Sequence, residues 1–175
     1  MEREERMSGG FEGLKALIVE DNQHMRSLLR ALLNSVGITD VSEASNGGTG
    51  IETLRRRGAD LVLTDLAMKP MDGLAFTRYI RTDPQSPNPF VPIIMITGHT
   101  EKHLVEQARD AGVTELLAKP VTAGHLFARI AEIVERPRAF VRTETYFGPD
   151  RRRHRAERYP GPWRRAEDFE DMLVR

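Results

Sequence analysis

The sequence predicts an α/β domain of five βα units, in which helices cover both faces of a five-stranded parallel sheet. Short apolar runs alternate five times with longer segments of helical period, and the chain contains no internal repeat. Two of the runs, DLVLT at 60–64 and VPIIMIT at 91–97, are aliphatic enough for burial on both faces. Because parallel strands need right-handed crossover connections, this alternation favours a doubly wound (βα)5 sheet.

The first two units are defined by the residues that can begin and end their helices. The run LKALIV at 14–19 predicts a strand, and a helix is expected at 22–36, begun by Asn22 and ended by Gly37. A weaker, more polar strand is expected at 38–44. The helix at 49–57 that follows is stopped by a glycine.

The remaining units follow the same pattern. The third strand at 60–64 precedes a helix at 72–81, after which four prolines in ten residues predict an extended loop. The fourth and fifth units are expected at 91–97 with 100–111, and at 114–118 with 123–135.

The chain is expected to divide into a flexible N-terminus at 1–12, a folded domain at 13–136 and an Arg-rich extension at 137–175. The extension has little periodicity and reads as a solvated arm, although its aromatic side chains favour docking against a surface. From Trp163, apolar residues recur at helical spacing through Leu173, which predicts a short amphipathic helix.

Composition excludes several classes of protein. The 26 basic and 26 acidic residues balance, so no overall charge draws the chain to nucleic acid or to an anionic membrane. The absence of cysteine excludes disulfides, a thiol nucleophile and cysteine-ligated zinc. Neither a secretory signal nor an apolar run long enough to span a bilayer is present, so a cytoplasmic protein is expected.

Polar side chains follow four of the five predicted strands. Glu20 and Asp21 follow the first strand, Asp65 the third, Thr97 closes the fourth and Lys119 follows the fifth. Because parallel strands end at one edge of a sheet, where such folds bind ligands, we expect these groups to converge. Taken alone, each residue also has an ordinary structural explanation. It could open a loop, stand as an acid at a helix start, form a turn or be an exposed lysine.

The expected cluster has a specific chemistry. Three carboxylates at one edge repel one another unless a hard divalent cation with oxygen ligands, most naturally Mg²⁺, neutralises them. Aspartate can accept a phosphoryl group as a covalent acyl phosphate, which gives Asp65 a candidate role. Lys119 would then supply positive charge to the phosphoryl oxygens, and Thr97 a hydroxyl donor.

This combination resembles the receiver domain of bacterial two-component response regulators. The resemblance covers about 13–136 and rests on the acidic pair, Asp65 with the downstream MKPMDG, the Thr97–Gly98 pair and the Lys119–Pro120 pair. It implies a CheY-like, flavodoxin-like sheet of order 2-1-3-4-5. It also implies that Asp65 is the phosphoacceptor and that Thr97 and Lys119 act on the phosphoryl group. The implied ligands of Mg²⁺ are Glu20, Asp21, Asp65 and the backbone carbonyl of Ala67.

Two positions depart from the family pattern. The family usually has proline four residues after the phosphorylated aspartate, whereas this chain has Lys69 there and Pro70 one step later. The family often has an aromatic residue three positions before the lysine, and here that position holds Leu116. A rotamer switch by a Tyr or Phe is therefore excluded, and coupling is expected to run through Thr97 and the loop or helix after the fourth strand.

The resemblance also implies partners. A histidine kinase or phosphotransfer protein would donate the phosphoryl group, and a downstream protein would read the result, because the chain has no recognisable output domain. A homodimer through the fourth-helix, fifth-strand and fifth-helix face, or through the C-terminal arm, is a further expectation. Nucleic acid is disfavoured because seven acids share the extension with its ten arginines.

Two other functions fit parts of the pattern. A receiver-like scaffold would bind its partner without phosphorylation. A haloacid-dehalogenase-type phosphatase would pass through an aspartyl phosphate, but that family needs a second aspartate two residues after the nucleophile, where this chain has Ala67. The sequence therefore favours a phosphoacceptor over an enzyme.

Overall fold

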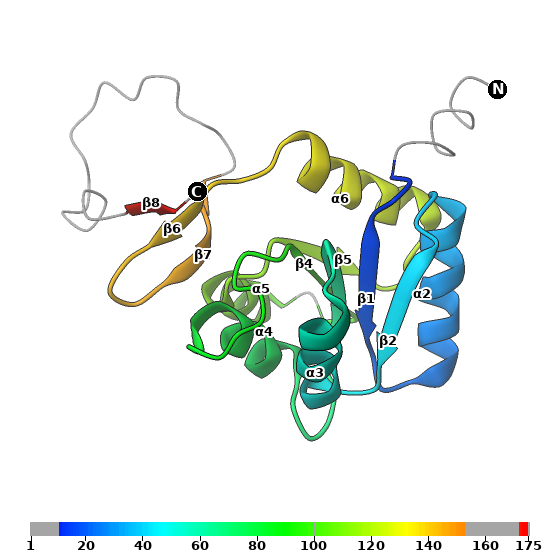
Figure 1. The fold of residues 1–175 in the computed structure, drawn as a ribbon, viewed down its shortest axis with the longest axis horizontal. Coiled ribbons are helices and arrows are strands. Elements are labelled where there is room, and N and C mark those ends of the chain that lie inside the picture. The colour runs from blue at the N-terminus through cyan, green and yellow to red at the C-terminus, as the bar shows by residue number, and fades with distance from the viewer. Residues whose placement is uncertain (1–10, 100, 153–171, 175) are drawn as a thin grey trace.

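The computed structural model describes residues 11–99, 101–152 and 172–174, and it places a parallel sheet between two layers of helices (Figure 1). The strands of this sheet are β1 (Lys15–Val19), β2 (Asp40–Ala44), β3 (Leu61–Asp65), β4 (Ile93–Thr97) and β5 (Glu115–Ala118). Their order is β2-β1-β3-β4-β5, and every neighbouring pair is parallel. The predicted fold class and strand order are confirmed.

Helices of the described residues cover both faces of the sheet. They are α2 (Gln23–Ser35), α3 (Gly47–Arg57), α4 (Gly73–Thr82), α5 (Lys102–Ala111) and α6 (Ala123–Glu135). Leu29 of α2 and Leu126 of α6 share one buried cluster with Ile18 of β1. Phe76 of α4 lies in a second cluster with Leu17, on the other face of the same strand. Alternate residues of β1 therefore serve two separate cores.

Side-chain caps set where the helices begin. The Asn22 Oδ1 atom accepts a hydrogen bond from the Met25 N–H at 3.0 Å, which agrees with the predicted start of the first helix. Helix α3 begins two residues earlier than predicted because Asn46 and Thr49 form a reciprocal capping box, which makes Gly47 the first helical residue.

The N-terminal boundary of the fold lies before residue 13. Phe11 falls within the segment predicted to be flexible, yet it is buried and its ring lies 5.2 Å from the ring of Phe127 on α6. Residues 1–10 lie outside the described part of the chain.

The C-terminal extension departs most from its prediction. Strands β6 (Phe140–Arg142) and β7 (Phe147–Pro149) form an antiparallel hairpin, and β8 (Met172–Val174) pairs antiparallel with β6. The amphipathic helix predicted from Trp163 to Leu173 is wrong at its end. Met172 and Leu173 form a strand there because the open edge of β6 offers backbone hydrogen-bond partners. The rest of that predicted helix lies outside the described residues.

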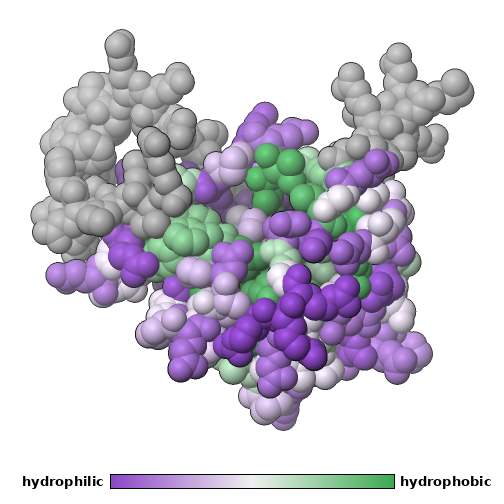
Figure 2. Space-filling model, in the orientation of Figure 1, coloured by the Kyte–Doolittle hydropathy of each residue, from purple (hydrophilic) through white to green (hydrophobic). Residues whose placement is uncertain are grey.

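The β6–β7 hairpin packs against the end of the sheet where the strands begin. The rings of Phe90, Phe140 and Phe147 lie 5.3 to 5.7 Å apart, and Phe147 is buried. Figure 2 shows a largely hydrophilic face on which hydrophobic residues gather beside this hairpin and near the carboxyl end of α6. Within the described residues, no helix combines the length and apolar character needed to cross a bilayer.

Candidate metal and phosphoryl site

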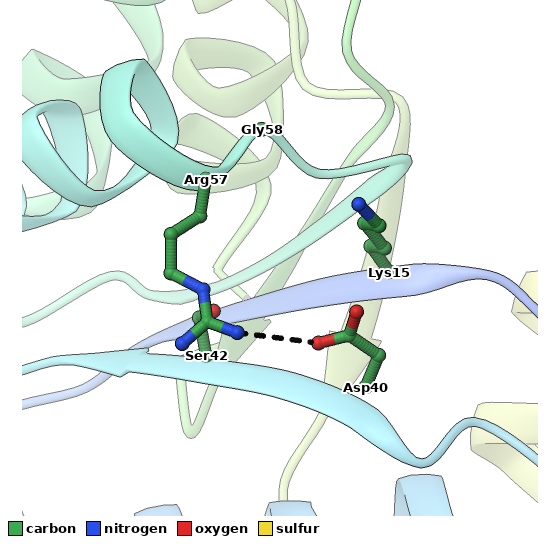
Figure 3. Close-up of a pocket in the computed structure, with 5 residues that line it drawn as sticks. All are labelled: Lys15, Asp40, Ser42, Arg57 and Gly58. Atoms are coloured by element: carbon green, nitrogen blue, oxygen red, sulfur yellow. Dashed lines mark ion pairs between the residues drawn. The ribbon is translucent and has the colours of Figure 1, made fainter.

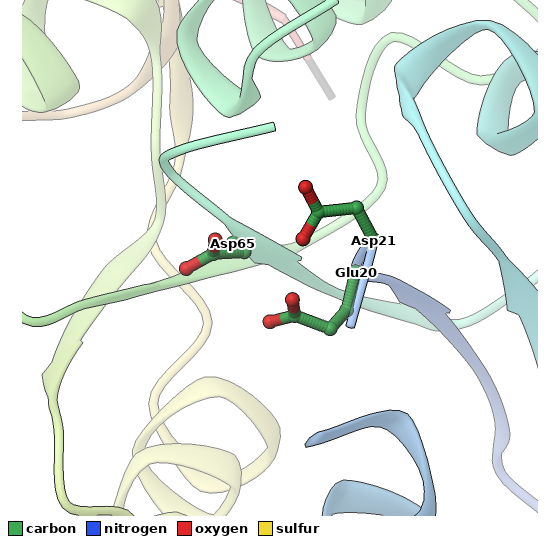
Figure 4. A group of neighbouring side chains, drawn as sticks. All are labelled: Glu20, Asp21 and Asp65. Carbon is green, nitrogen blue, oxygen red and sulfur yellow. The ribbon is translucent and has the colours of Figure 1, made fainter. Parts of the chain in front are cut away.

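Three carboxylates meet at the edge of the sheet where the strands end (Figure 4). Strands β1 and β3 are neighbours, with Val19 paired to Thr64, so the next residues along each strand, Glu20 and Asp65, lie side by side. Asp21 joins them across the bend that follows β1. One carboxylate oxygen from each acid lies within 4.8 Å of the others. The parallel topology thus brings together the three acids that the sequence singled out.

Lys119 reaches the same cluster from the end of β5. Its Nζ lies 3.0 Å from the Asp65 Oδ1 atom and 3.9 Å from the Glu20 Oε2 atom. Its backbone N–H donates to the Thr97 carbonyl at 2.9 Å, so the ends of β4 and β5 are joined where the lysine side chain departs. The ammonium is therefore shared between two buried acids.

Thr97 lies at this edge, but its hydroxyl is bonded to its own loop. The Oγ1 atom accepts from the His99 N–H at 2.9 Å and donates to the His99 carbonyl at 3.2 Å. The His99 imidazole is exposed and lies 3.8 Å from the Glu101 carboxylate. For Thr97 to donate to a group on Asp65, the loop after β4 must change its hydrogen bonds.

Two residues of the loop after β3 contribute through their backbone positions. Ala67 lies in an exposed bend two residues beyond Asp65. Gly73, the last residue of the MKPMDG motif, begins α4, and its N–H donates to the Leu66 carbonyl at 2.9 Å. A Cβ atom at Gly73 would overlap the main-chain oxygen of Asp65. A glycine is therefore required here by the close approach of α4 to the end of β3.

Burial perturbs the ionisation of Glu20. Only 2% of its surface is exposed. Desolvation raises its pKa to about 7, against the hydrogen bond that its Oε1 atom accepts from the Asn22 N–H at 3.0 Å. The charge of Asp65 raises the pKa further, and Lys119 lowers it. Burial therefore favours the protonated form of Glu20 more than it would be favoured in water.

The donor set fits a hard divalent cation. The Glu20 Oε2 atom is buried and has no hydrogen-bond partner. Three carboxylates face the one ammonium of Lys119 in this cluster, so the described residues leave negative charge to be neutralised. An all-oxygen set of this kind suits Mg²⁺, which prefers a few carboxylates and completes its shell with water or substrate oxygens.

Two cavities in the described residues lie away from the acids. A pocket of about 80 Å³ is lined by Lys15, Asp40, Ser42, Arg57 and Gly58, near the start of β1 and β2 (Figure 3). An exposed ion pair between Arg57 and Asp40, 3.6 Å apart, crosses it. The other, of about 160 Å³, lies between the hairpin and the end of α6. Neither lining includes a residue of the acid cluster.

Comparison with known proteins identifies the family. The family model of the response regulator receiver domain matches residues 16–131. The chain is a response regulator receiver protein. The receiver is 33% identical over 125 residues to chemotaxis protein CheY-3 of Vibrio cholerae, covering 71% of this chain and 95% of that relative. It is also 33% identical over 123 residues to chemotaxis protein CheY of Pseudomonas aeruginosa, covering 70% and 98% of the two chains.

A solved structure gives the same picture of the receiver. The crystallised chemotaxis protein CheY4 of Vibrio cholerae aligns with a TM-score of 0.63 and 26% identity, covering 69% of this chain and 98% of that chain. The family match ends at residue 131, before the β6–β7 hairpin. In the position where the family often has an aromatic residue, Leu116 is half-buried beside Met95 in the cluster under α5.

Proposed function

We propose that this response regulator is a phosphoacceptor switch, in which Asp65 takes a phosphoryl group in the presence of Mg²⁺. The observation that carries the proposal is the position of Asp65, with two further acids within 4.8 Å on one side and the Lys119 ammonium at 3.0 Å. The donor would be the phosphohistidine of a histidine kinase or of a phosphotransfer protein.

The residues that would hold Mg²⁺ are Glu20, Asp21 and Asp65, with the Ala67 carbonyl as a further ligand. The buried Glu20 Oε2 atom, which has no hydrogen-bond partner, supports this assignment because such an atom gains from a cation. When bound, the cation supplies positive charge that offsets the carboxylates and the phosphoryl oxygens.

The covalent step would be carried by Asp65. One carboxylate oxygen attacks the phosphorus, the P–N bond of the donor breaks, and its electron pair returns to the imidazole nitrogen. The product is an acyl phosphate on Asp65. Lys119 would exchange its contact with the Asp65 carboxylate for the phosphoryl oxygens, and the Thr97 hydroxyl would leave the His99 backbone to donate to the same group.

The output would be altered binding of a protein partner. A phosphoryl group adds negative charge and acceptor oxygens at the ends of β3, β4 and β5, which favours a loop arrangement in which Thr97 and Lys119 point to it. Because Leu116 has no ring to rotate, the change would spread through the loop after β4 and through α5. A homodimer through α5, β5 and α6, or through the C-terminal arm, is a further proposed outcome.

A mass measurement tests the proposal. Wild-type protein and Asp65→Asn are incubated with Mg²⁺ and a small phosphodonor, and a gain of about 80 Da is expected for wild type alone. Asp60→Asn, at the other end of β3, is the matched control and should gain the same mass as wild type. An equal gain in Asp65→Asn would place the phosphoryl group on another residue and contradict the role of Asp65, whereas no gain in wild type would favour the scaffold function.

A further inference from the structure

The acidic pair after β1 has an unusual backbone requirement. Successive residues of an extended strand point to opposite faces, yet the carboxylates of Glu20 and Asp21 lie in one cluster (Figure 4). The ladder between β1 and β2 ends at Val19, and the chain bends at Asp21. The two acids can therefore share one ion only if the peptide groups of this bend keep their orientation.

Arg26 holds those peptide groups. Its Nη1 atom donates to the Glu20 carbonyl at 2.7 Å and to the Asp21 carbonyl at 3.1 Å. Arg26 lies on α2, whose first turn is capped by Asn22, so the helix that follows the bend also fixes it. The arginine side chain is only 17% exposed, which limits the alternative positions open to it.

A second carboxylate orients the arginine. The Arg26 Nε atom donates to Glu43 of β2 at 3.2 Å, and the other oxygen of Glu43 accepts from the Arg30 Nε atom at 2.6 Å. Arg30 in turn donates to the Val41 carbonyl at 3.0 Å. Arg26 is thus held between an edge strand and the bend, whereas Arg30 donates to Glu43 and Val41, which both belong to β2.

We propose that Arg26 is a positioning residue for the cation site, which acts by fixing the two carbonyls so that the Glu20 and Asp21 side chains turn toward the same point. This role rests on the proposed function, because it concerns the same Mg²⁺ site. Arg26 contacts the carbonyl oxygens of the bend through Nη1 and the Glu43 carboxylate through Nε.

The direction in which Mg²⁺ affinity changes when Arg26 is replaced distinguishes a positioning role from an effect of its charge. A guanidinium close to a cation site opposes cation binding through its charge, so removing that charge alone would tighten the binding of Mg²⁺. Removing a group that orients the ligands weakens binding instead, by roughly 10- to 100-fold for such supporting contacts. The two roles of Arg26 therefore predict opposite shifts in affinity.

The test is a calorimetric titration of the full chain with Mg²⁺ and, separately, with Ca²⁺. Arg26→Gln should weaken Mg²⁺ binding about tenfold or more, and Arg26→Lys should fall between it and wild type. Arg30→Gln removes the other arginine that binds Glu43. Its Mg²⁺ affinity should stay within about twofold of that of wild type, a much smaller change than the one expected for Arg26→Gln. The preference for Mg²⁺ over Ca²⁺ should also fall in Arg26→Gln, because Mg²⁺ demands stricter geometry.

The outcomes are distinct. Equal or tighter Mg²⁺ binding by Arg26→Gln and Arg26→Lys, with wild type still binding Mg²⁺ and gaining the phosphoryl mass, would overturn the role of Arg26 alone. An unchanged preference between the two ions, with both affinities lowered equally, would also overturn it and assign Arg26 to stability. A wild-type protein that binds no Mg²⁺ and gains no mass would overturn the proposed function together with this inference.

Discussion

The two ends of the central sheet each bury a glutamate, and the two glutamates differ in the cationic side chains that compensate their charge. Where the strands end, Glu20 shares a single ammonium, that of Lys119, with Asp65. Where β5 begins, Glu115 is met by Arg138 at 3.0 Å and by Arg129 at 3.5 Å. Both glutamates are 5% exposed or less.

The difference shows how the charge of one residue type is compensated by arginines in one place and left short of cations in another. A buried carboxylate with arginine partners is compensated by the protein itself, so it joins elements: here Arg138 brings the C-terminal extension to β5. A buried carboxylate short of cations keeps its need for positive charge, which a ligand can meet. The hairpin end of the sheet is therefore a structural joint, and the acid end is the cation site that we propose.

The largest expected effect is on the structural joint. Arg81 is 2% exposed and donates to the carbonyls of Gly112 and Pro89 at 2.9 and 2.8 Å, with its guanidinium 5.0 Å from the Phe140 ring centre. Arg81→Ala leaves these acceptors without their donor and should lower the free energy of unfolding by about 3 kcal/mol or more. Arg78→Ala, on an exposed position of the same helix, is the control.

Urea denaturation measures this loss, and calorimetry on folded Arg81→Ala should find Mg²⁺ affinity close to wild type. A stability loss no larger than that of Arg78→Ala would mean that the hairpin end does not depend on its buried arginine. A large change in Mg²⁺ affinity would mean that the two ends of the sheet are not separate in function.

Exchanging the two glutamates for glutamine should give opposite results. Glu20→Gln should weaken Mg²⁺ binding by about 10- to 100-fold, because a neutral amide replaces a charged ligand. Glu115→Gln should leave Mg²⁺ binding unchanged and lower the stability instead, by about 1 to 3 kcal/mol, since Arg129 and Arg138 lose their shared partner. Calorimetry measures the Mg²⁺ affinity of both variants, and urea denaturation measures their stability. Equal effects of the two variants on Mg²⁺ affinity would contradict the distinction between the two ends of the sheet.

A smaller effect is expected where α4 approaches the acid end. Gly73→Ala places a Cβ against the main-chain oxygen of Asp65, so helix or strand must move, at a cost of about 1 to 3 kcal/mol. The rate of phosphoryl transfer to Asp65 should also fall in Gly73→Ala, and time-resolved mass measurement follows this rate. Gly124→Ala, in α6 and with nothing within 4 Å of an added Cβ, is the control and should be neutral or slightly stabilising. Equal behaviour of the two variants would contradict the close approach.

The acid end could be predicted from the sequence because it depends on topology. Once five parallel strands were expected, Glu20, Asp65 and Lys119 had to end at one edge, whatever the details of packing. Arg26 could not be found in this way, and the MKPMDG motif contained Gly73 without showing that α4 approaches β3 there. A guanidinium bonded to two carbonyls, or a helix touching a strand end, is a contact with the backbone of another segment, and such a contact leaves no periodic signal in the sequence.

The hairpin end could not be predicted because its strands are short and are stabilised by packing against residues distant in the sequence. Strands of three residues, such as Phe140–Arg142, show no alternation long enough to distinguish them from a loop. The burial of Arg81 also depends on the hairpin covering it, so the sequence of α4 alone reads as an ordinary exposed face. The aromatic residues of the extension were the one usable signal, and they indicated docking without its location.

The smallest expected effect is the pH dependence of stability contributed by Glu20. In the metal-free protein its pKa is raised from 4.5 to about 7, so the folded state binds this proton more tightly than the unfolded state does. The resulting stabilisation is fully present below pH 4.5 and is lost as the pH rises through about 7. Between pH 6 and pH 8, wild type should lose about 1 kcal/mol relative to Glu20→Gln, because the amide does not titrate.

Urea denaturation of both proteins in chelator at the two pH values measures this difference, and comparison with the variant cancels the contribution of the histidines. Saturating Mg²⁺ should reverse the trend, since the cation binds the ionised carboxylate and becomes more effective as the proton leaves. A difference between wild type and Glu20→Gln that does not change with pH would mean that Glu20 keeps its charge in the folded protein. The acid end of the sheet would then be as well compensated as the end that Glu115 occupies.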